Sequence, residues 1–356
     1  MAKGRILINL RTLLNLLMKR TTLFFALWGL MLILLVAPSC NQAKNKQAVV
    51  SADTSLMLPL NGVDQYVEIH GKSTKNPVLL FIHGGPAWPA TPMIRSRNQN
   101  LFEDITVVCW DQRNCGKSKS DTLVPLNIDL YISDAHELTQ FLKSRFHTDK
   151  IYIAGHSWGS VIGLNLARKY PEDYAAYIGM GQVINLKKGD QIARDRMCQL
   201  AKEAGDEGTV KAEEAIPFDS EKGYTGGWND MIKHRILMVK YRINDHDTIY
   251  ENQAIAKYDD YKALDWVGPV FRDGNKLFSA LMGTDFTRVT EFKIPMYIMA
   301  GRYDYNTANP LVAEWFKTIS APKKEFFWFE NSGHSPQWEE PERFGEAVRK
   351  IVRSTN

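Results

Sequence analysis

The segment with the clearest chemical signature is residues 155–159, which read GHSWG. It satisfies the pattern G-x-S-x-G between an expected strand at 150–155 and an expected helix at 161–170. In that context the turn is so tight that the residues flanking the serine must be small, and it lifts the hydroxyl above the sheet edge. The helix dipole and the N–H of Trp158 would then face an oxygen that becomes negative. The motif predicts that Ser157 is a nucleophile.

A serine hydroxyl is a poor nucleophile until a neighbouring base removes its proton. Asp304 follows an expected strand at 294–301, and His334 follows another at 325–329. Both come after Ser157 in the order serine, acid, histidine that accompanies this motif. Both also follow carboxyl ends of strands, where open α/β sheets place their sites. We expect His334 to be the general base and Asp304 to orient it; a helix N-cap and a solvated loop histidine are the alternatives.

Residues 83–86 (HGGP) follow an apolar run and supply two adjacent glycines. Glycine lets the backbone pass close to a ligand and offer an N–H to a negative oxygen. We therefore expect the backbone N–H groups of Gly85 and Trp158 to form an oxyanion hole. The alternative for residues 83–86 is a tight turn with no role in chemistry.

Residues 111–118 (DQRNCGKS) form a polar, turn-rich segment after another apolar run at 105–110. The segment contains no evident nucleophile–base pair, so we expect it to support the catalytic loops through hydrogen bonds. Cys115 is expected to be a small packed residue, because nothing near it in the sequence marks a reactive thiol.

Together these segments resemble the α/β-hydrolase superfamily, and more narrowly its proline iminopeptidase-like branch. The resemblance extends from about residue 63 to residue 352 and is carried by HGGP (83–86), DQRNCGKS (111–118), GHSWGS (155–160), GRYD (301–304) and GH (333–334). It implies a serine hydrolase with Ser157 as nucleophile, Asp304 as orienting acid and His334 as base, and with Gly85 and Trp158 as oxyanion donors.

Iminopeptidases also hold the free amino group of the substrate with carboxylates of an inserted domain. The resemblance therefore implies a pair of such carboxylates in this chain, and Glu213 and Glu214 are the candidates. The alternative for these two residues is a solvated helix face.

The elements that must position these residues follow from the pattern of apolar residues. Apolar runs such as 77–83 (PVLLFIH) read as strands buried on both faces, and they alternate with stretches of helical spacing. The alternation stops over residues 186–286, which hold helix-like stretches and many charges, and then resumes. We expect an α/β fold with a mostly parallel sheet flanked by helices, formed by residues 56–185 and 287–356, and a mainly helical cap at 186–286.

The N-terminal segment has the parts of an export signal. Five basic residues precede residues 21–38, which carry no charge, and the stretch ends in VAPSC at 36–40. The small residue before Cys40 resembles a bacterial lipobox, which implies a lipidated Cys40 at the mature N-terminus. The alternative is an uncleaved membrane anchor. Both place the catalytic domain outside the cytoplasm, in the bacterial cell envelope, and residues 41–55 are expected to be a linker.

Composition excludes several other functions. The five basic residues of the leader account for more than the whole net charge of +4, so the remainder of the 356-residue chain shows no preference for nucleic acid. The four cysteines form no CxxC pair, so neither a structural metal nor a disulfide framework is expected. We expect no cofactor, and membrane contact only through the N-terminal segment. The oligomeric state is not indicated.

The leading hypothesis is hydrolysis of a small ester or amide, through an acyl-enzyme on Ser157. An aminopeptidase of the proline iminopeptidase type, acting on a short peptide, comes first. A carboxylesterase or lipase-like hydrolase and an acyltransferase of the same fold are the alternatives, since the last differs only in how well the site excludes water. A non-catalytic binding module is disfavoured by the intact order of serine, acid and histidine.

Overall fold

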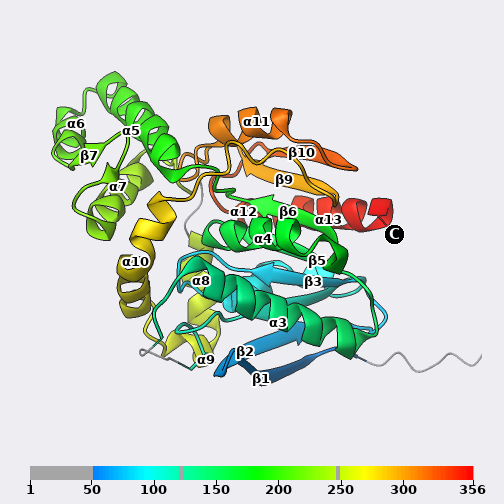
Figure 1. Ribbon diagram of the computed structural model, residues 1–356. Helices are drawn as coiled ribbons and strands as arrows, with labels where there is room; N and C mark the ends of the chain where they lie inside the picture. Colours follow the sequence, from blue (N-terminus) through cyan, green and yellow to red (C-terminus); the bar gives the residue numbers. More distant parts are fainter. Residues whose placement is uncertain (1–50, 120–123, 246–248, 356) are drawn as a thin grey trace, which may run out of the picture. The chain divides into compact units, whose positions relative to one another are not determined.

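A computed structural model describes residues 51–119, 124–245 and 249–355. Its central feature is an eight-stranded sheet with the order β1-β2-β4-β3-β5-β6-β9-β10 (Figure 1). β2 pairs antiparallel with β1 and β4, and the remaining neighbours are parallel. The strands are β1 (Thr54–Leu60), β2 (Val63–His70), β3 (Val78–Ile82), β4 (Thr106–Trp110), β5 (Ile151–His156), β6 (Tyr174–Met180), β9 (Met296–Gly301) and β10 (Lys324–Phe329).

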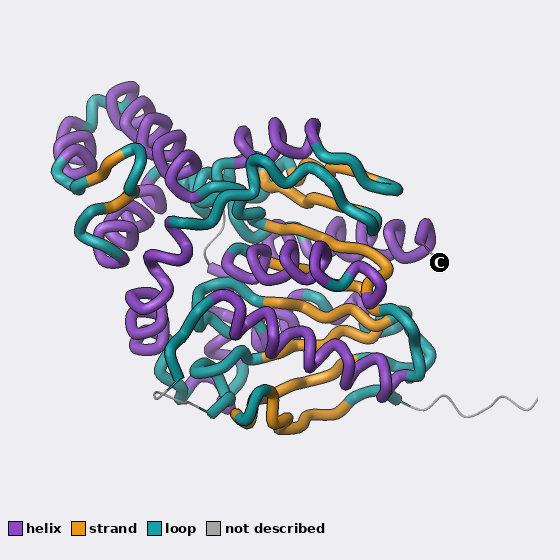
Figure 2. Tube along the Cα trace, viewed as in Figure 1, coloured by secondary structure: helices purple, strands orange, loops and turns teal. Residues whose placement is uncertain are grey.

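Helices cover both faces of this sheet (Figure 2). Every residue of β3, β4 and β5 is buried, as expected for parallel strands packed on two sides. One face packs against α3 (Ile128–Phe146), α4 (Trp158–Lys169) and α11 (Asn309–Thr318). The other face packs against α2 (Thr91–Arg97), α12 (Pro336–Glu339) and α13 (Pro341–Thr355), with the short 3₁₀ helices η1 (Gln99–Leu101) and η2 (Pro171–Asp173) in the connections.

A mostly helical insertion, which we call the cap, separates β6 from β9 (Figure 1). Its base is closed by a bridge between Asn185 and Asp285 and by a 2.8 Å hydrogen bond from Phe286 N to Ile184 O. It contains α5 (Leu186–Glu203), α6 (Glu207–Glu214), a small hairpin of β7 (Phe218–Asp219) and β8 (Gly223–Tyr224), α7 (Trp228–Lys240), α8 (Ile249–Lys257), α9 (Asp259–Lys262) and α10 (Val267–Met282).

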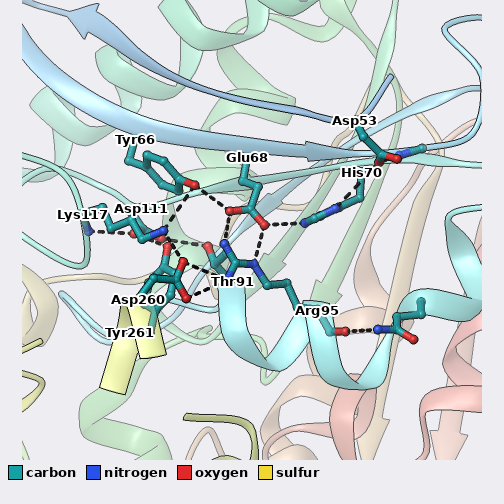
Figure 3. A network of polar contacts seen from close by, with 12 residues as sticks. Asp53, Tyr66, Glu68, His70, Thr91, Arg95, Asp111, Lys117, Asp260 and Tyr261 are labelled. Atoms are coloured by element: carbon teal, nitrogen blue, oxygen red, sulfur yellow. Dashed lines mark hydrogen bonds and ion pairs between the residues drawn. The ribbon is translucent and has the colours of Figure 1, made fainter. Parts of the chain in front are cut away.

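The cap is attached to the sheet domain by a polar network around α9 (Figure 3). Asp260 accepts hydrogen bonds from Arg95, at 3.0 Å, and from Lys117. The hydroxyl of Tyr261 donates to Asp111 Oδ2 at 2.7 Å. Two of these partners, Asp111 and Lys117, belong to the DQRNCGKS segment, so that segment also holds the cap.

Three boundaries differ from the sequence expectations. β1 begins at Thr54, inside the expected linker 41–55. It is an edge strand in which exposed residues alternate with half-buried ones, and Pro59 interrupts its apolar run. α3 begins at Ile128, whereas the spacing of apolar residues predicts a helix only over 134–146. α4 begins at Trp158, directly after the serine. The leader and Cys40 lie outside the described residues, and within those residues no helix is long and apolar enough to cross a membrane.

Candidate active site

Ser157 lies at the sharp corner between β5 and α4, with φ 53° and ψ −120°. A positive φ is unfavourable for a residue with a side chain, and the neighbouring glycines make the corner possible. A Cβ at Gly155 would lie 2.6 Å from Gly159 O, and one at Gly159 would lie 2.1 Å from Ile82 O. Gly155 is therefore required by the close approach of β5 to α4, and Gly159 by the close approach of α4 to β3.

Asp304 and His334 lie together after the ends of two neighbouring strands, β9 and β10. His334 Nδ1 is 3.2 Å from both carboxylate oxygens of Asp304. Because a carboxylate can only accept, Nδ1 carries the hydrogen and Nε2 is left as the acceptor. Thr307 fixes the carboxylate in turn, through its N at 3.1 Å and its Oγ1 at 2.8 Å.

The charges around this pair raise the pKa of His334. Burial alone would lower the pKa of His334, but the negative charges of Asp304 and of Asp245 outweigh it and raise the pKa. Burial acts in the opposite sense on Asp304, whose pKa is nevertheless lowered by His334 and by the hydrogen bonds from Thr307. Asp304 therefore stays ionised and stabilises the imidazolium that forms when His334 takes a proton.

Ser157 and His334 line one cavity of about 220 Å³, together with Gly84 and Gly85 of the HGGP segment. Gly85 has φ 115°, a conformation open to glycine, and a Cβ there would lie 2.6 Å from Ala87 N. Trp158 is the first residue of α4, so its N–H has no acceptor within the helix. The structure thus brings the expected nucleophile, base and acid and the two expected oxyanion donors to one edge of the sheet.

Gln112 links three of the loops that form this edge. Its N donates to His83 Nε2 at 3.1 Å, and its side-chain amide donates to His83 O at 2.9 Å. Its Oε1 accepts from Trp158 Nε1 at 2.9 Å. These hydrogen bonds are the support that the DQRNCGKS segment was expected to give. Cys115 of the same segment is buried, and burial raises its pKa well above the ordinary value, as for an inert packed thiol.

The cap also contacts the catalytic loops directly, through residues 243–245. The carbonyl of Ile243 accepts from Tyr305 N at 2.9 Å, and that of Asn244 accepts from His334 N at 2.8 Å. A Cβ at Gly333 would lie 2.1 Å from Asn244 O. We call residues 243–245 the cap connector, because they join α7 to the loops that carry Asp304 and His334.

Glu213 and Glu214, the expected holders of an amino group, do not line the cavity. Glu213 is buried inside the cap, where it pairs with Arg194 at 2.7 Å and with His234 Nδ1 at 3.0 Å. Glu214 is exposed on α6, which packs against α5 and α7. The expectation for both residues was wrong in position, because α6 contributes to the cap's own interior and outer surface.

Two other carboxylates of the cap, Asp245 and Glu251, line the cavity instead. Glu251 accepts from Trp88 Nε1 at 2.9 Å, and Asp245 Oδ2 accepts from the Asn244 amide at 3.1 Å. Burial raises the pKa of Asp245 to about 6, and burial also raises the pKa of Glu251. Among the described residues, neither carboxylate forms an ion pair with a lysine or arginine, and Asp245 Oδ1 has no hydrogen-bond partner. No spacing in the sequence marks these residues, because Asp245 follows α7 and Glu251 lies in the first turn of α8, both within the least patterned region.

The site shows no arrangement suited to a metal. In the described ranges, no group of three His, Cys, Asp or Glu side chains is placed to hold a metal ion. The cavity itself offers the hydroxyl of Ser157, the imidazole of His334 and the carboxylates of Asp245 and Glu251.

Comparisons with known proteins agree with this fold. A sequence model of the alpha/beta hydrolase fold matches residues 77–341, so the chain belongs to the α/β-hydrolase family. "Probable aminopeptidase YbaC" of Bacillus subtilis is 28% identical over 310 residues, which cover 83% of this chain and 95% of that protein. A proline iminopeptidase of Saccharolobus solfataricus is 25% identical over 300 residues, covering 82% and 89%.

A solved structure of a proline iminopeptidase-related protein from Thermus thermophilus superimposes with a TM-score of 0.58 at 19% identity, covering 85% of this chain and 98% of that chain. The two curated relatives agree with the resemblance to proline iminopeptidases that the sequence motifs indicated. The solved structure shares the fold.

Proposed function

We propose that this hydrolase acts through an acyl-enzyme on Ser157. The observation that carries the proposal is the shared cavity of Ser157 and His334, with Asp304 held at 3.2 Å behind the imidazole. His334 Nε2 removes the Ser157 proton, Ser157 Oγ attacks the substrate carbonyl, and His334 then protonates the leaving group. The N–H groups of Gly85 and Trp158 stabilise the oxyanion, and a water activated by His334 releases the acyl group.

We propose further that the substrate is a small amide with a free amino group. Asp245 and Glu251 are two partly desolvated carboxylates that pair with no lysine or arginine among the described residues, and a substrate ammonium would supply a permanent positive charge. The cavity of about 220 Å³ suits a small N-terminal residue such as proline. The names of the two relatives, an aminopeptidase and a proline iminopeptidase, agree with this substrate class.

An esterase is the second candidate, because one wall of the same cavity is apolar. Trp228, Met231, Ile232 and Val270 line it, and an uncharged acyl group would bury against them. An ester substrate makes no use of Asp245 and Glu251, so the two functions are separable by substrate charge. If the protein is an acyltransferase, addition of an acceptor alcohol should yield the ester of that alcohol in place of the free acid.

The nucleophile is tested with a fluorophosphonate probe on Ser157→Ala and on the matched control Ser144→Ala, an exposed serine of α3. We expect labelling and hydrolysis to be lost in Ser157→Ala, with turnover reduced by at least about 10⁴-fold, and retained in Ser144→Ala. Labelling that persists in Ser157→Ala would contradict the proposed mechanism.

The substrate class is tested by comparing prolyl naphthylamide, N-acetylprolyl naphthylamide and naphthyl acetate. The aminopeptidase proposal requires a preference of at least about tenfold for the free amine over its acetylated form, and the loss of that preference in Glu251→Gln. Efficient cleavage of naphthyl acetate, with no preference between the two amides, would favour the esterase.

We also propose that the chain is exported and anchored through its leader, on the strength of the lipobox-like segment ending at Cys40. Cells fed a labelled fatty acid should yield a labelled wild-type protein and an unlabelled Cys40→Ala variant. An unlabelled wild type that stays in the membrane fraction would instead indicate an uncleaved anchor.

A further inference from the structure

The active-site cavity contains one arginine, Arg235 of α7, that the proposed hydrolysis does not use. Its side chain is only 11% exposed. The structure records two acceptors for its guanidinium within the described residues: Asp190 Oδ1, which accepts from Nη2, and the Met238 sulfur, 3.6 Å from Nη1. A thioether is a weak acceptor, so within the described residues Asp190 is the one strong acceptor recorded for this guanidinium.

The cavity therefore has two poles of opposite charge. Asp245 and Glu251 form the acidic pole, and Glu251 is bonded to Trp88, which follows the HGGP segment. Arg235 forms the basic pole. It makes no ion pair with either carboxylate in the described part of the chain, and its charge acts instead on the Asp304–His334 pair. A substrate that satisfies both poles carries an ammonium at one end and an anion at the other.

The proposed reaction splits a peptide into an acyl half and an amine half, and each half meets one of these poles. The acyl half carries the free amino group and stays on Ser157, while the amine half leaves after His334 protonates its nitrogen. In a dipeptide the leaving half is a free amino acid, whose carboxylate is separated from that nitrogen by one carbon. Because Asp245 and Glu251 take up the ammonium of the acyl half, Arg235 is the charged group of the cavity left for the carboxylate of the leaving half. A guanidinium binds carboxylates through parallel N–H bonds.

We propose that Arg235 binds the terminal carboxylate of the leaving amino acid, so that the preferred substrates are free dipeptides with a small N-terminal residue. This inference rests on the proposed aminopeptidase function. The competing interpretation is that Arg235 serves only as the counter-ion of Asp190, which is itself fully buried. In that case the carboxylate of the substrate would make no difference to the rate.

The experiment compares kcat/KM for the dipeptide Pro-Gly and for its C-terminal amide, Pro-Gly-NH₂. The wild type should prefer the free acid by about tenfold or more, as a buried charge-assisted hydrogen bond would require. In Arg235→Gln the ratio should fall to about one. The control Lys233→Gln removes an exposed cation two residues away on α7 and should keep the wild-type ratio.

A second variant guards against misfolding caused by an unpaired Asp190. The double variant Arg235→Met with Asp190→Leu removes both charges together, which a buried pair tolerates better than the loss of one partner. It too should lose the preference for the free acid.

A wild-type ratio near one, or an Arg235→Gln variant that keeps the preference, would overturn the role of Arg235 and leave the aminopeptidase proposal standing. If the wild type is labelled by fluorophosphonate but cleaves neither peptide, the aminopeptidase proposal itself fails and this inference falls with it.

Discussion

His156, the residue before the expected nucleophile, lies against the expected base. Its ring is 4.9 Å from that of His334, and its Nε2 is 3.1 Å from the carbonyl oxygen of His334. Burial lowers the pKa of His156 to about 3, so the ring is neutral and Nε2 donates to that carbonyl. His156 also lines the cavity, but its hydrogen bond goes to the main chain of His334, so we expect it to act as a positioning residue for that histidine.

Replacing this positioning residue should change turnover more than substrate binding. In His156→Ala we expect kcat to fall by about five- to tenfold, the equivalent of one lost hydrogen bond, with KM nearly constant. His156→Gln keeps a donor amide and should recover part of the loss. A KM effect larger than the kcat effect in His156→Ala would show that the ring contributes to substrate binding instead.

The pH dependence should differ between charged and uncharged substrates. His334 must be neutral to accept a proton, so kcat/KM falls as pH drops below its raised pKa. Asp245 must be ionised to attract an ammonium, and its pKa of about 6 adds a second loss for amine substrates as pH falls.

The measurement is the slope of log kcat/KM against pH on the acid side. It should approach about two for prolyl naphthylamide and about one for naphthyl acetate. Asp245→Asn should reduce the first slope to about one, and a slope of two that survives this substitution would contradict the assignment.

At the scale of elements, the corner between β5 and α4 depends on the close approach of β3. Gly159→Ala places a methyl 2.1 Å from Ile82 O, a backbone atom at the start of the HGGP segment. We expect a loss of about 1–3 kcal/mol in the free energy of unfolding and a fall in kcat, because the oxyanion donor at Gly85 must shift.

Gly208→Ala is the matched control, because a Cβ there meets only Asp206 Oδ1, at 3.6 Å. It lies on α6 and should stabilise the protein slightly, by about 0.5–1 kcal/mol. Urea unfolding of the two variants measures both effects, and equal stabilities would contradict the steric argument.

The network around α9 is the second feature with a consequence at this scale (Figure 3). Tyr261→Phe removes a donor from the buried carboxylate of Asp111 and should lower the free energy of unfolding by about 1–3 kcal/mol. Tyr258→Phe keeps the ring under Arg95 and should change it by less than about 0.5 kcal/mol. If limited proteolysis cuts the cap no faster in Tyr261→Phe than in the wild type, the network does not hold the cap.

At the scale of the whole molecule, the residues of the core were predictable and those of the cap were not. The sheet strands are apolar runs that end in chemistry-bearing residues, so Ser157, Asp304 and His334 could be placed at one edge from the sequence. This works because parallel strands with helices on both faces leave little choice of connection. The main strand missed in the core, β1, is an edge strand whose apolar run is interrupted by Pro59, which weakens a strand prediction.

The cap follows no comparable rule, because its helices pack on one another in ways that periodicity does not specify. The sequence analysis predicted that two adjacent glutamates of α6 bind the amino group of the substrate. In the structure Glu213 is buried in the cap, where it pairs with Arg194, and Glu214 is exposed. The carboxylates that do reach the cavity are Asp245, in the cap connector, and Glu251, in the first turn of α8. Only tertiary structure reveals that placement.

The cap connector has a consequence for engineering. Its carbonyls accept hydrogen bonds from Tyr305 N, beside Asp304, and from His334 N. We therefore expect that the cap cannot be exchanged without disturbing the loops that carry Asp304 and His334. Chimaeras in which the whole cap is replaced by that of a relative should lose turnover, even on substrates too small to contact the residues of the new cap. Grafts that leave residues 243–245 native should retain it.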